Sequence, residues 1–255
     1  MKLFLMSNST NHGESFLSHS ITEFVSAMNG SDLTFVPYAQ VDHDAYVATV
    51  RAALEPRGIT VTSLHEVSDP AVHLATCPNL FVGGGNTFLL VKTLHDLDLV
   101  RVIRERVAAG MVYLGASAGT NISAPTMRTT NDMPIVEPAS FETLGLVPFQ
   151  INPHYLDADP ASTHNGETRL TRLTEFMEHN DVGVLGLREG TWLEVDGDRA
   201  TIGGASVCEF SSDPALYIRG GRTMEVSGDV SWLLGETGTF DVPARAFDAP
   251  DRTFG

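Results

Sequence analysis

Short apolar runs alternate with amphipathic segments along the first two thirds of the chain, and this alternation constrains the fold more than any other feature. The apolar runs are brief, rich in Val, Leu or Phe, and end at polar or Gly residues; they span residues 2–6, 33–37, 59–64, 79–82 and 111–114. The segments between them carry apolar residues at helical spacing, as at Tyr46, Val47, Val50 and Leu54. Alternating strands and helices predict crossover connections, and therefore an α/β fold with a mostly parallel sheet flanked by helices.

The pattern changes in the last third of the chain. We expect a helix from Asn165-Gly166 to about His179. Strand-like runs separated by Gly-containing turns follow it, at residues 182–187, 192–195, 200–202, 206–210 and 215–218. Such runs predict a C-terminal antiparallel meander attached to the parallel sheet. We therefore expect a single α/β domain over residues 1–228 and a C-terminal extension over residues 229–255.

Composition argues against several classes of partner. The 255 residues carry a formal net charge of −16, whereas nucleic acids and anionic membranes both select basic surfaces. Polar residues follow at once after Met6, and the apolar runs are too short for a membrane span, so we expect neither a signal peptide nor a membrane segment. Cys77 and Cys208 form no C-x-x-C pair, which favours a reducing, cytoplasmic location without a structural zinc.

The strongest local signal is Gly115-Ala116-Ser117-Ala118-Gly119, which lies between an expected strand and an expected helix. A G-x-S-x-G turn in this context is typical of a catalytic serine, because small flanking residues allow a sharp bend that lifts the hydroxyl above the sheet. The sequence therefore predicts Ser117 as a nucleophile and the N–H of Ala118 as an oxyanion donor. The alternative is a plain turn that packs a strand against a helix.

A second glycine cluster, Gly83-Gly84-Gly85-Asn86-Thr87, follows the expected strand at 79–82. It lacks the G-x-G-x-x-G spacing and the lysine of phosphate-binding loops. Beside a serine nucleophile, the N–H of Gly85 is a candidate second oxyanion donor. Asn86 is a candidate helix cap and substrate ligand. A tight turn without a catalytic role is the alternative.

Among the nine histidines, His154 is the best candidate for the base that activates Ser117. It follows a short apolar run and an Asn-Pro break, and parallel sheets present functional residues at such strand ends. A carboxylate is then needed to hold the imidazole. Asp132 is one candidate, and Glu189, at a strand end before a glycine, is the other. The residues alone do not choose between them.

Taken together, these segments resemble the peptidase E family of serine peptidases, the aspartyl dipeptidases. The resemblance covers about residues 1–210, and the matching segments are 7–10, 82–88, 117–119, 128–136, 150–154 and 166–169. It implies a class I glutamine amidotransferase-like fold, with Ser117 as nucleophile and His154 as base. Asp132 matches the acid that the family's charge relay usually includes, so it is preferred, and Glu189 remains a competitor. The resemblance also implies cleavage of dipeptides with an N-terminal aspartate, an acyl transfer that needs no metal or organic cofactor.

Three residues near the expected site depart from the family pattern. Ala116 stands where tryptophan is common, Thr120 stands where alanine is usual, and Arg188 replaces a proline before Glu189. Because the chemistry-bearing residues are intact, these departures bear on substrate range more than on the reaction.

Binding an aspartate side chain in so acidic a chain requires a local cation. Arg169 is expected in the first turn of the helix after Gly166, where the guanidinium and the helix dipole would both attract a carboxylate. The alternative is a solvated arginine offset by Glu167, and Arg172, one turn later, is expected to be solvated.

Two other functions fit the same motifs. One is a cyanophycinase-like peptidase acting on an aspartate-backbone polymer, which the segments at 129–134 and 166–169 disfavour. The other is a non-catalytic anion-binding protein that uses the glycine loops. The leaving-group preference and the oligomeric state, a homodimer included, are left open by the sequence.

Overall fold

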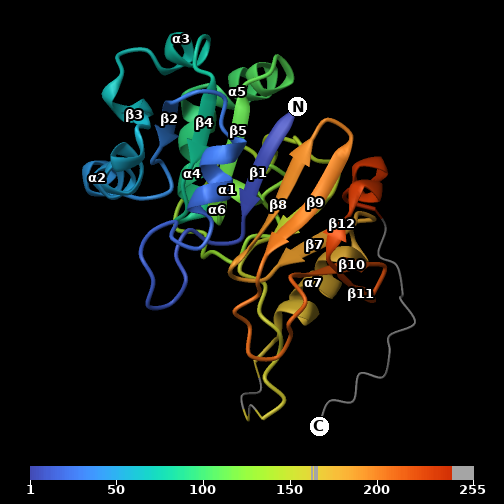
Figure 1. Cartoon of the computed structure of the whole chain (residues 1–255). Helices are drawn as coiled ribbons and strands as arrows, with labels where there is room; N and C mark the ends of the chain where they lie inside the picture. The colour runs from blue at the N-terminus through green and yellow to red at the C-terminus, as the bar shows by residue number, and fades with distance from the viewer. Residues whose placement is uncertain (162, 164–165, 243–255) are drawn as a thin grey trace.

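The computed structural model describes residues 1–161, 163 and 166–242, and the alternating first part of the chain forms the parallel half of a large sheet (Figure 1). Its strands are β1 (Lys2–Met6), β2 (Asp32–Val36), β3 (Thr60–Ser63), β4 (Asn79–Val82) and β5 (Val112–Ala116). They lie in the order β1-β5-β4-β2-β3, and each neighbouring pair is parallel. The predicted parallel sheet is confirmed.

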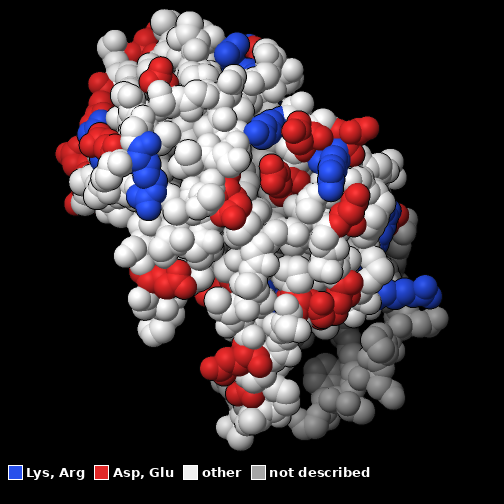
Figure 2. Space-filling view, viewed as in Figure 1, with Lys and Arg blue, Asp and Glu red and all other residues white. Residues whose placement is uncertain are grey.

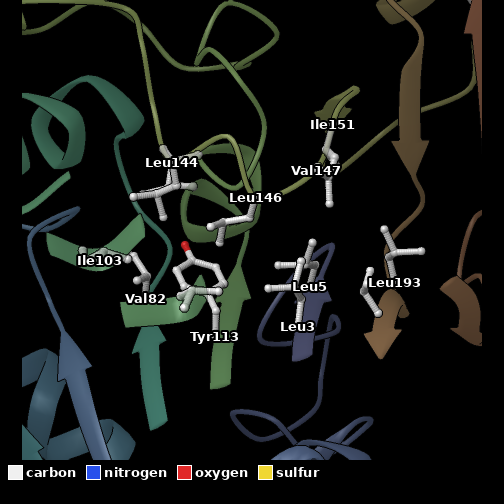
Figure 3. Close-up of a cluster of buried hydrophobic side chains, with 14 of the residues drawn as sticks. Leu3, Leu5, Val82, Ile103, Tyr113, Leu144, Leu146, Val147, Ile151 and Leu193 are labelled. Carbon is white, nitrogen blue, oxygen red and sulfur yellow. The ribbon is translucent and has the colours of Figure 1, made fainter. Parts of the chain in front are cut away.

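Helices cover both faces of this sheet, as predicted. They are α1 (Ile21–Ala27), α2 (His43–Leu54), α3 (Pro70–Leu74), α4 (Thr87–Asp96), α5 (Leu99–Ala108) and the short α6 (Ala118–Asn121). Alternate residues of β1 point to opposite faces: Phe4 packs in the cluster that contains α1 and α2, whereas Leu3 packs in the cluster that contains α4 and α5. Figure 3 shows the second cluster, where Leu3, Leu5 and Tyr113 from the sheet face side chains of the 144–151 segment.

The antiparallel strands divide between two sheets. β8 (Thr191–Asp196), β9 (Arg199–Gly204) and β12 (Gly228–Asp229) extend the large sheet beyond β1. A second sheet has the order β11-β10-β7-β6 and contains β6 (Gln150–Asn152), β7 (Val184–Leu187), β10 (Ala215–Arg219) and β11 (Arg222–Val226). The meander is therefore present but split, and residues 206–210, which were expected to form a strand, do not form one.

The helix α7 (Arg169–Glu178) packs against the second sheet through Leu173 and Met177. It begins later than the expected opening after Asn165-Gly166, because Thr168 caps it by accepting the N–H of Thr171. This cap makes Arg169 the first residue of the helix.

The segment after β12 lies against the rest of the chain as far as residue 242. Val230 and Leu233, the latter in the 3-10 helix η3 (Ser231–Gly235), are buried, and Thr239 pairs with Asp181. The remainder of the expected extension, residues 243–255, lies outside the described residues.

The surface reflects the acidic composition. Figure 2 shows acidic side chains in several patches over one face, interspersed with fewer basic ones. None of the helices in the described part of the chain combines the length and apolar character needed to cross a membrane.

Candidate active site

Five chain segments meet where parallel strands of the two sheets end. The residues that follow these strands are Ser7 after β1, Gly83 after β4, Ser117 after β5, His154 after β6 and Glu189 after β7. The carboxyl ends of parallel strands lie at the same end of a sheet, so the loops that follow these strands lie together. Here the loops of the two sheets face each other. The site is thus built jointly by the two sheets.

Ser117 lies on a sharp bend whose shape is fixed by the neighbouring glycines. Its φ of 53° and ψ of −111° are unusual for a residue with a side chain. A Cβ on Gly119 would lie 2.1 Å from the carbonyl oxygen of Val82, and one on Gly115 would lie 2.8 Å from the backbone of Gly119. The turn therefore packs so closely against β4 that neither glycine has room for a side chain.

A chain of hydrogen bonds runs from Ser117 through His154 to Glu189. The Oγ of Ser117 lies 2.9 Å from Nε2 of His154, and Nδ1 of His154 lies 2.6 Å from Oε1 of Glu189. The hydrogen bond from His154 lowers the pKa of the Glu189 carboxyl, against the opposing effect of burial. With Nδ1–H donated to the carboxylate, Nε2 is free to accept the proton of the serine hydroxyl.

His154 is held by a contact that joins three strand ends. Its φ is 53°, and its backbone N–H donates to Oγ of Ser7 at 2.9 Å. The Ser7 hydroxyl in turn donates to the carbonyl oxygen of Leu187, also at 2.9 Å. One buried hydroxyl therefore ties the end of β1 to the loop after β6 and to β7. In the sequence, Ser7 stands out only as part of segment 7–10, which matches the family, and nothing there indicates its contact with His154.

Arg188, next to Glu189, is fully buried and anchored by two carboxylates. It forms paired hydrogen bonds with Asp157, at 2.6 and 2.8 Å, and with Glu225, at 2.7 and 2.9 Å. These bonds from Arg188 lower the pKa of Asp157. The sequence marked Arg188 only as a departure from the family pattern, and nothing marked its partners, which are 31 and 37 residues away.

A cavity of about 590 Å³ opens beside this hydrogen-bond chain. Ser117, His154 and Glu189 line one part of it, and Asp132 and Arg169 also lie in its wall. Residues 207–210, from the run that was expected to be a strand, complete the wall. The volume falls within the range of roughly 300–1,000 Å³ that is usual for small-molecule sites.

Asp132 lines the cavity but does not contact His154, contrary to our preferred assignment of the acid. Its Oδ2 accepts hydrogen bonds from the N–H of Thr87 at 2.7 Å, from the Thr87 hydroxyl at 2.6 Å and from the Thr130 hydroxyl at 3.2 Å. The reason is topological: Asp132 meets the start of α4, whereas Glu189 follows β7, and β7 pairs with β6, the strand that precedes His154. In this structure, therefore, Glu189 and not Asp132 is the carboxylate that is hydrogen-bonded to His154.

The two expected oxyanion donors lie on either side of Ser117. Ala118 lines the cavity described above, and Gly85 lines a second cavity of about 450 Å³ that also reaches Ser117 and His154. Within the described residues, the N–H groups of Ala118 and Gly85 take part in no hydrogen bond. Both donors are therefore available.

Asn86, expected as a substrate ligand, is engaged elsewhere. Its Oδ1 caps α4 by accepting the N–H of Leu89 at 3.1 Å, and its Nδ2 donates to the carbonyl oxygen of Met133 at 2.9 Å. In the described part of the chain, it lines neither cavity that borders Ser117. Its capping function is as expected, but its position does not favour a ligand role.

The side chain of Arg169 lines the cavity. It forms no ion pair among residues 1–161, 163 and 166–242. The pKa of Arg169 is lowered mainly by burial, and the nearby positive charge of Arg172 lowers it further. The negative charge of Asp132 has the opposite effect and raises it. Glu167, which we considered as its partner, pairs instead with Arg172 at 3.5 Å. Arg169 is thus a partly desolvated cation with no close anion in the part of the chain that the structure describes.

The chain is similar to known peptidases in sequence and in fold. The model of peptidase family S51 matches residues 3–203. The chain is 54% identical over 251 residues to Peptidase E of Streptomyces coelicolor, covering 96% of this chain and 100% of that protein. It is 44% identical to a probable alpha-aspartyl dipeptidase of Drosophila melanogaster, covering 91% and 97% of the two chains. A crystal structure of a putative peptidase E from Listeria monocytogenes superposes with a TM-score of 0.61 at 26% identity, covering 80% and 98%. None of these relatives favours the cyanophycinase-like or the non-catalytic alternative.

Proposed function

Because the chain belongs to peptidase family S51, we propose that it is a serine dipeptidase that hydrolyses dipeptides with an N-terminal aspartate, with Ser117 as its nucleophile. One observation carries the proposal: the Ser117–His154–Glu189 hydrogen-bond chain borders the same cavity as Arg169, a cation without a close anion in the described residues. The relatives named Peptidase E and probable alpha-aspartyl dipeptidase support it.

The reaction is acyl transfer through a covalent intermediate. His154 accepts the proton of the Ser117 hydroxyl, and Oγ attacks the scissile carbonyl carbon to give a tetrahedral oxyanion. Collapse of this species breaks the peptide C–N bond, and His154 returns the proton to the leaving amine. A water molecule, deprotonated by His154, then attacks the aspartyl ester, and its breakdown releases aspartate and restores the Ser117 hydroxyl.

The groups around the serine stabilise the charges that form during these steps. The N–H groups of Gly85 and Ala118 donate to the oxyanion, and loss of one such donor costs about 2.7–4 kcal/mol of barrier. Glu189 holds the Nδ1–H of His154 and stabilises the imidazolium that forms when the ring accepts the serine proton. Asn86 acts in this scheme as the cap that fixes the start of α4.

Arg169 binds the β-carboxylate of the substrate. It is the first residue of α7, where the helix dipole opposes a cation and favours an anion. A bound carboxylate therefore neutralises the unpaired guanidinium and also interacts favourably with the helix dipole. The guanidinium can hold it by two parallel hydrogen bonds. The acidic surface would repel such a substrate only beyond about a Debye length, roughly 8 Å at physiological salt, so a local pair inside the cavity can dominate.

Small acidic dipeptides are thus the partners in this proposal, and the cytoplasm is the location. Both cysteines, Cys77 and Cys208, are free thiols in the structure, which agrees with a reducing compartment.

The test is a panel of Asp-Leu, Asn-Leu and Glu-Leu assayed with wild type, Ser117→Ala, Arg169→Met and Arg172→Met. We expect the wild type to prefer Asp-Leu over Asn-Leu by about 100-fold or more, because an uncharged side chain leaves the partly buried guanidinium unpaired. Ser117→Ala should abolish turnover, and Arg169→Met should remove the preference. Arg172→Met is the matched control, since this exposed arginine lies one turn along the same helix.

Each of three results would contradict one part of the proposal. Turnover by Ser117→Ala would exclude the serine mechanism. A preference that survives Arg169→Met would remove Arg169 from substrate recognition, and equal rates on Asp-Leu and Asn-Leu by the wild type would exclude the aspartate specificity.

A further inference from the structure

We propose that Asp132 binds the free α-ammonium group of the substrate, so that the cavity recognises a zwitterionic amino terminus and not only an acidic side chain. The proposal rests on the proposed dipeptidase function and assigns a ligand to a carboxylate that the hydrogen-bond chain from Ser117 does not use.

The first observation is the way in which the carboxylate of Asp132 is held. All three hydrogen bonds from the start of α4 and from Thr130 end on one oxygen, Oδ2. Within residues 1–161, 163 and 166–242, Oδ1 accepts no hydrogen bond, and the residue lines the cavity beside Ser117. A carboxylate fixed through one oxygen offers the other to a ligand in a defined direction.

The second observation is the charge that lies opposite. Arg169 lines the same cavity and is attracted by Asp132, yet the two side chains do not approach within salt-bridge distance of 4 Å. Each charge is therefore left without a close partner among the described residues. An ammonium and a carboxylate separated by a short linker can bridge such a pair, with each end next to the protein charge of opposite sign.

An N-terminal aspartate has this arrangement of charges. Its α-ammonium and its β-carboxylate are attached to adjacent carbons, so both can enter the cavity together. With the carboxylate on Arg169, the ammonium is left to face an acceptor on the other side. Charge-assisted hydrogen bonds of this type are about twice as strong as those between neutral groups.

The other carboxylates in the cavity wall are less suited to this role. Glu189 accepts the hydrogen bond of His154 through Oε1, and a bound ammonium there would compete with the imidazolium that the reaction forms. Glu209 is exposed, and no hydrogen bond within the described residues orients it. Asp132 alone combines a fixed orientation, a free oxygen and an opposing cation.

The inference gives Asp132 a role in specificity in place of the charge relay. A substrate whose amino group is acylated, or whose aspartate lies inside a longer peptide, brings no ammonium to Oδ1 and leaves this carboxylate unpaired. The site would then reject blocked and internal aspartates while it accepts free ones, as a dipeptidase must.

Asp132→Asn is the sharpest substitution to test this. The N–H of Thr87 needs an acceptor, so the amide oxygen takes the place of Oδ2 and the NH₂ group faces the cavity in place of Oδ1. The variant keeps the structural bonds of the side chain but presents a donor where the ammonium needs an acceptor. Glu209→Gln is the matched control, because it also removes one negative charge from the cavity wall.

We expect Asp132→Asn to lower kcat/KM for Asp-Leu by about 100-fold and to leave N-acetyl-Asp-Leu within about threefold of wild type. Glu209→Gln should leave both within about threefold. In the wild type, kcat/KM for Asp-Leu should also fall above about pH 8, where an α-amino group loses its proton, and this fall should be absent in Asp132→Asn. The pH profile of the wild type tests the proposal even if the variant does not fold.

Binding to Ser117→Ala, measured by calorimetry, separates this inference from the proposed function. If Asp-Leu binds more tightly than N-acetyl-Asp-Leu and Asp132→Asn removes the difference, the ammonium site stands, even if the wild type shows no turnover. If Asp132→Asn leaves the ratio unchanged, or if neither ligand binds, the inference is wrong. A wild-type kcat/KM that stays constant through pH 8–9 would also overturn it.

Discussion

The two halves of the candidate site are built in different ways. The Ser117 bend belongs to the large sheet, and uncharged groups fix it: Gly119 packs against Val82 with no room for a Cβ, and the Tyr113 hydroxyl donates to the Gly119 carbonyl. The His154–Glu189 half belongs mainly to the second sheet, and side-chain hydrogen bonds fix it. Ser7 joins His154 to Leu187, and Arg188 is held by Asp157 and Glu225.

This difference predicts different sensitivities. A close-packed turn of small residues carries no charge, so neither pH nor salt bears on it directly. A network of buried ions and hydrogen bonds depends on every member, because removing one leaves its partners unsatisfied. Charge-removing substitutions should therefore disturb the His154–Glu189 half and leave the Ser117 bend in place.

The largest effect is expected for Glu189→Gln. The amide cannot stabilise the imidazolium, and it favours the wrong tautomer of His154, so kcat for Asp-Leu should fall by about 10⁴-fold with little change in thermal stability. Asp132→Asn, measured beside it, should act mainly on KM. If Asp132→Asn instead lowered kcat as much as Glu189→Gln does, the partner of His154 would have been assigned to the wrong carboxylate.

A smaller effect is expected for Arg188→Met, which keeps the volume but removes the charge. The side chains of Asp157 and Glu225 are 21% and 42% exposed, so the loss should lie at the low end of the range for broken buried pairs, about 3 kcal/mol in urea denaturation. Arg101→Met, which removes an exposed pair with Glu105, is the control and should cost much less, because water screens this pair. Equal losses for the two variants would mean that the buried network does not stabilise this half of the site.

The smallest effect concerns acid stability. The pKa of Glu189 is lowered from its ordinary value of 4.5 by the hydrogen bond from His154. A carboxyl with a depressed folded-state pKa stabilises the protein above its unfolded-state value, and this contribution is lost as pH falls through the folded-state value. The stability difference between wild type and Glu189→Gln should therefore shrink as the pH falls below 4.5. A difference that grows on acidification would contradict the direction of the shift.

Local pattern was enough to predict the large sheet and the serine turn. Strands β1 and β4 were placed with the correct bounds, because their apolar runs end at polar or Gly residues. The Gly-Ala-Ser-Ala-Gly segment predicted the bend at Ser117, since only small residues fit there. The position of His154 at the end of a short strand, next to a proline, made it a candidate base, and its Nε2 lies 2.9 Å from Oγ of Ser117.

The local pattern could not predict which residues far apart in the sequence lie together. The sequence offered Asp132 and Glu189 with equal local merit, and the family resemblance favoured the one that lies away from His154. Residues 206–210 have the composition of a strand but form no strand, and residues 207–210 line the cavity. Tertiary context overrode local propensity there.

The parallel sheet, the helices that cover it and the bend that presents Ser117 could be predicted from the chain, because each depends on the size and periodicity of residues that are close in sequence. The carboxylate beside His154, the carboxylate in the cavity with Arg169 and the burial of Arg188 became known only from the folded molecule. Those outcomes depend on which strand ends the two sheets bring together, and no short stretch of sequence carries that information.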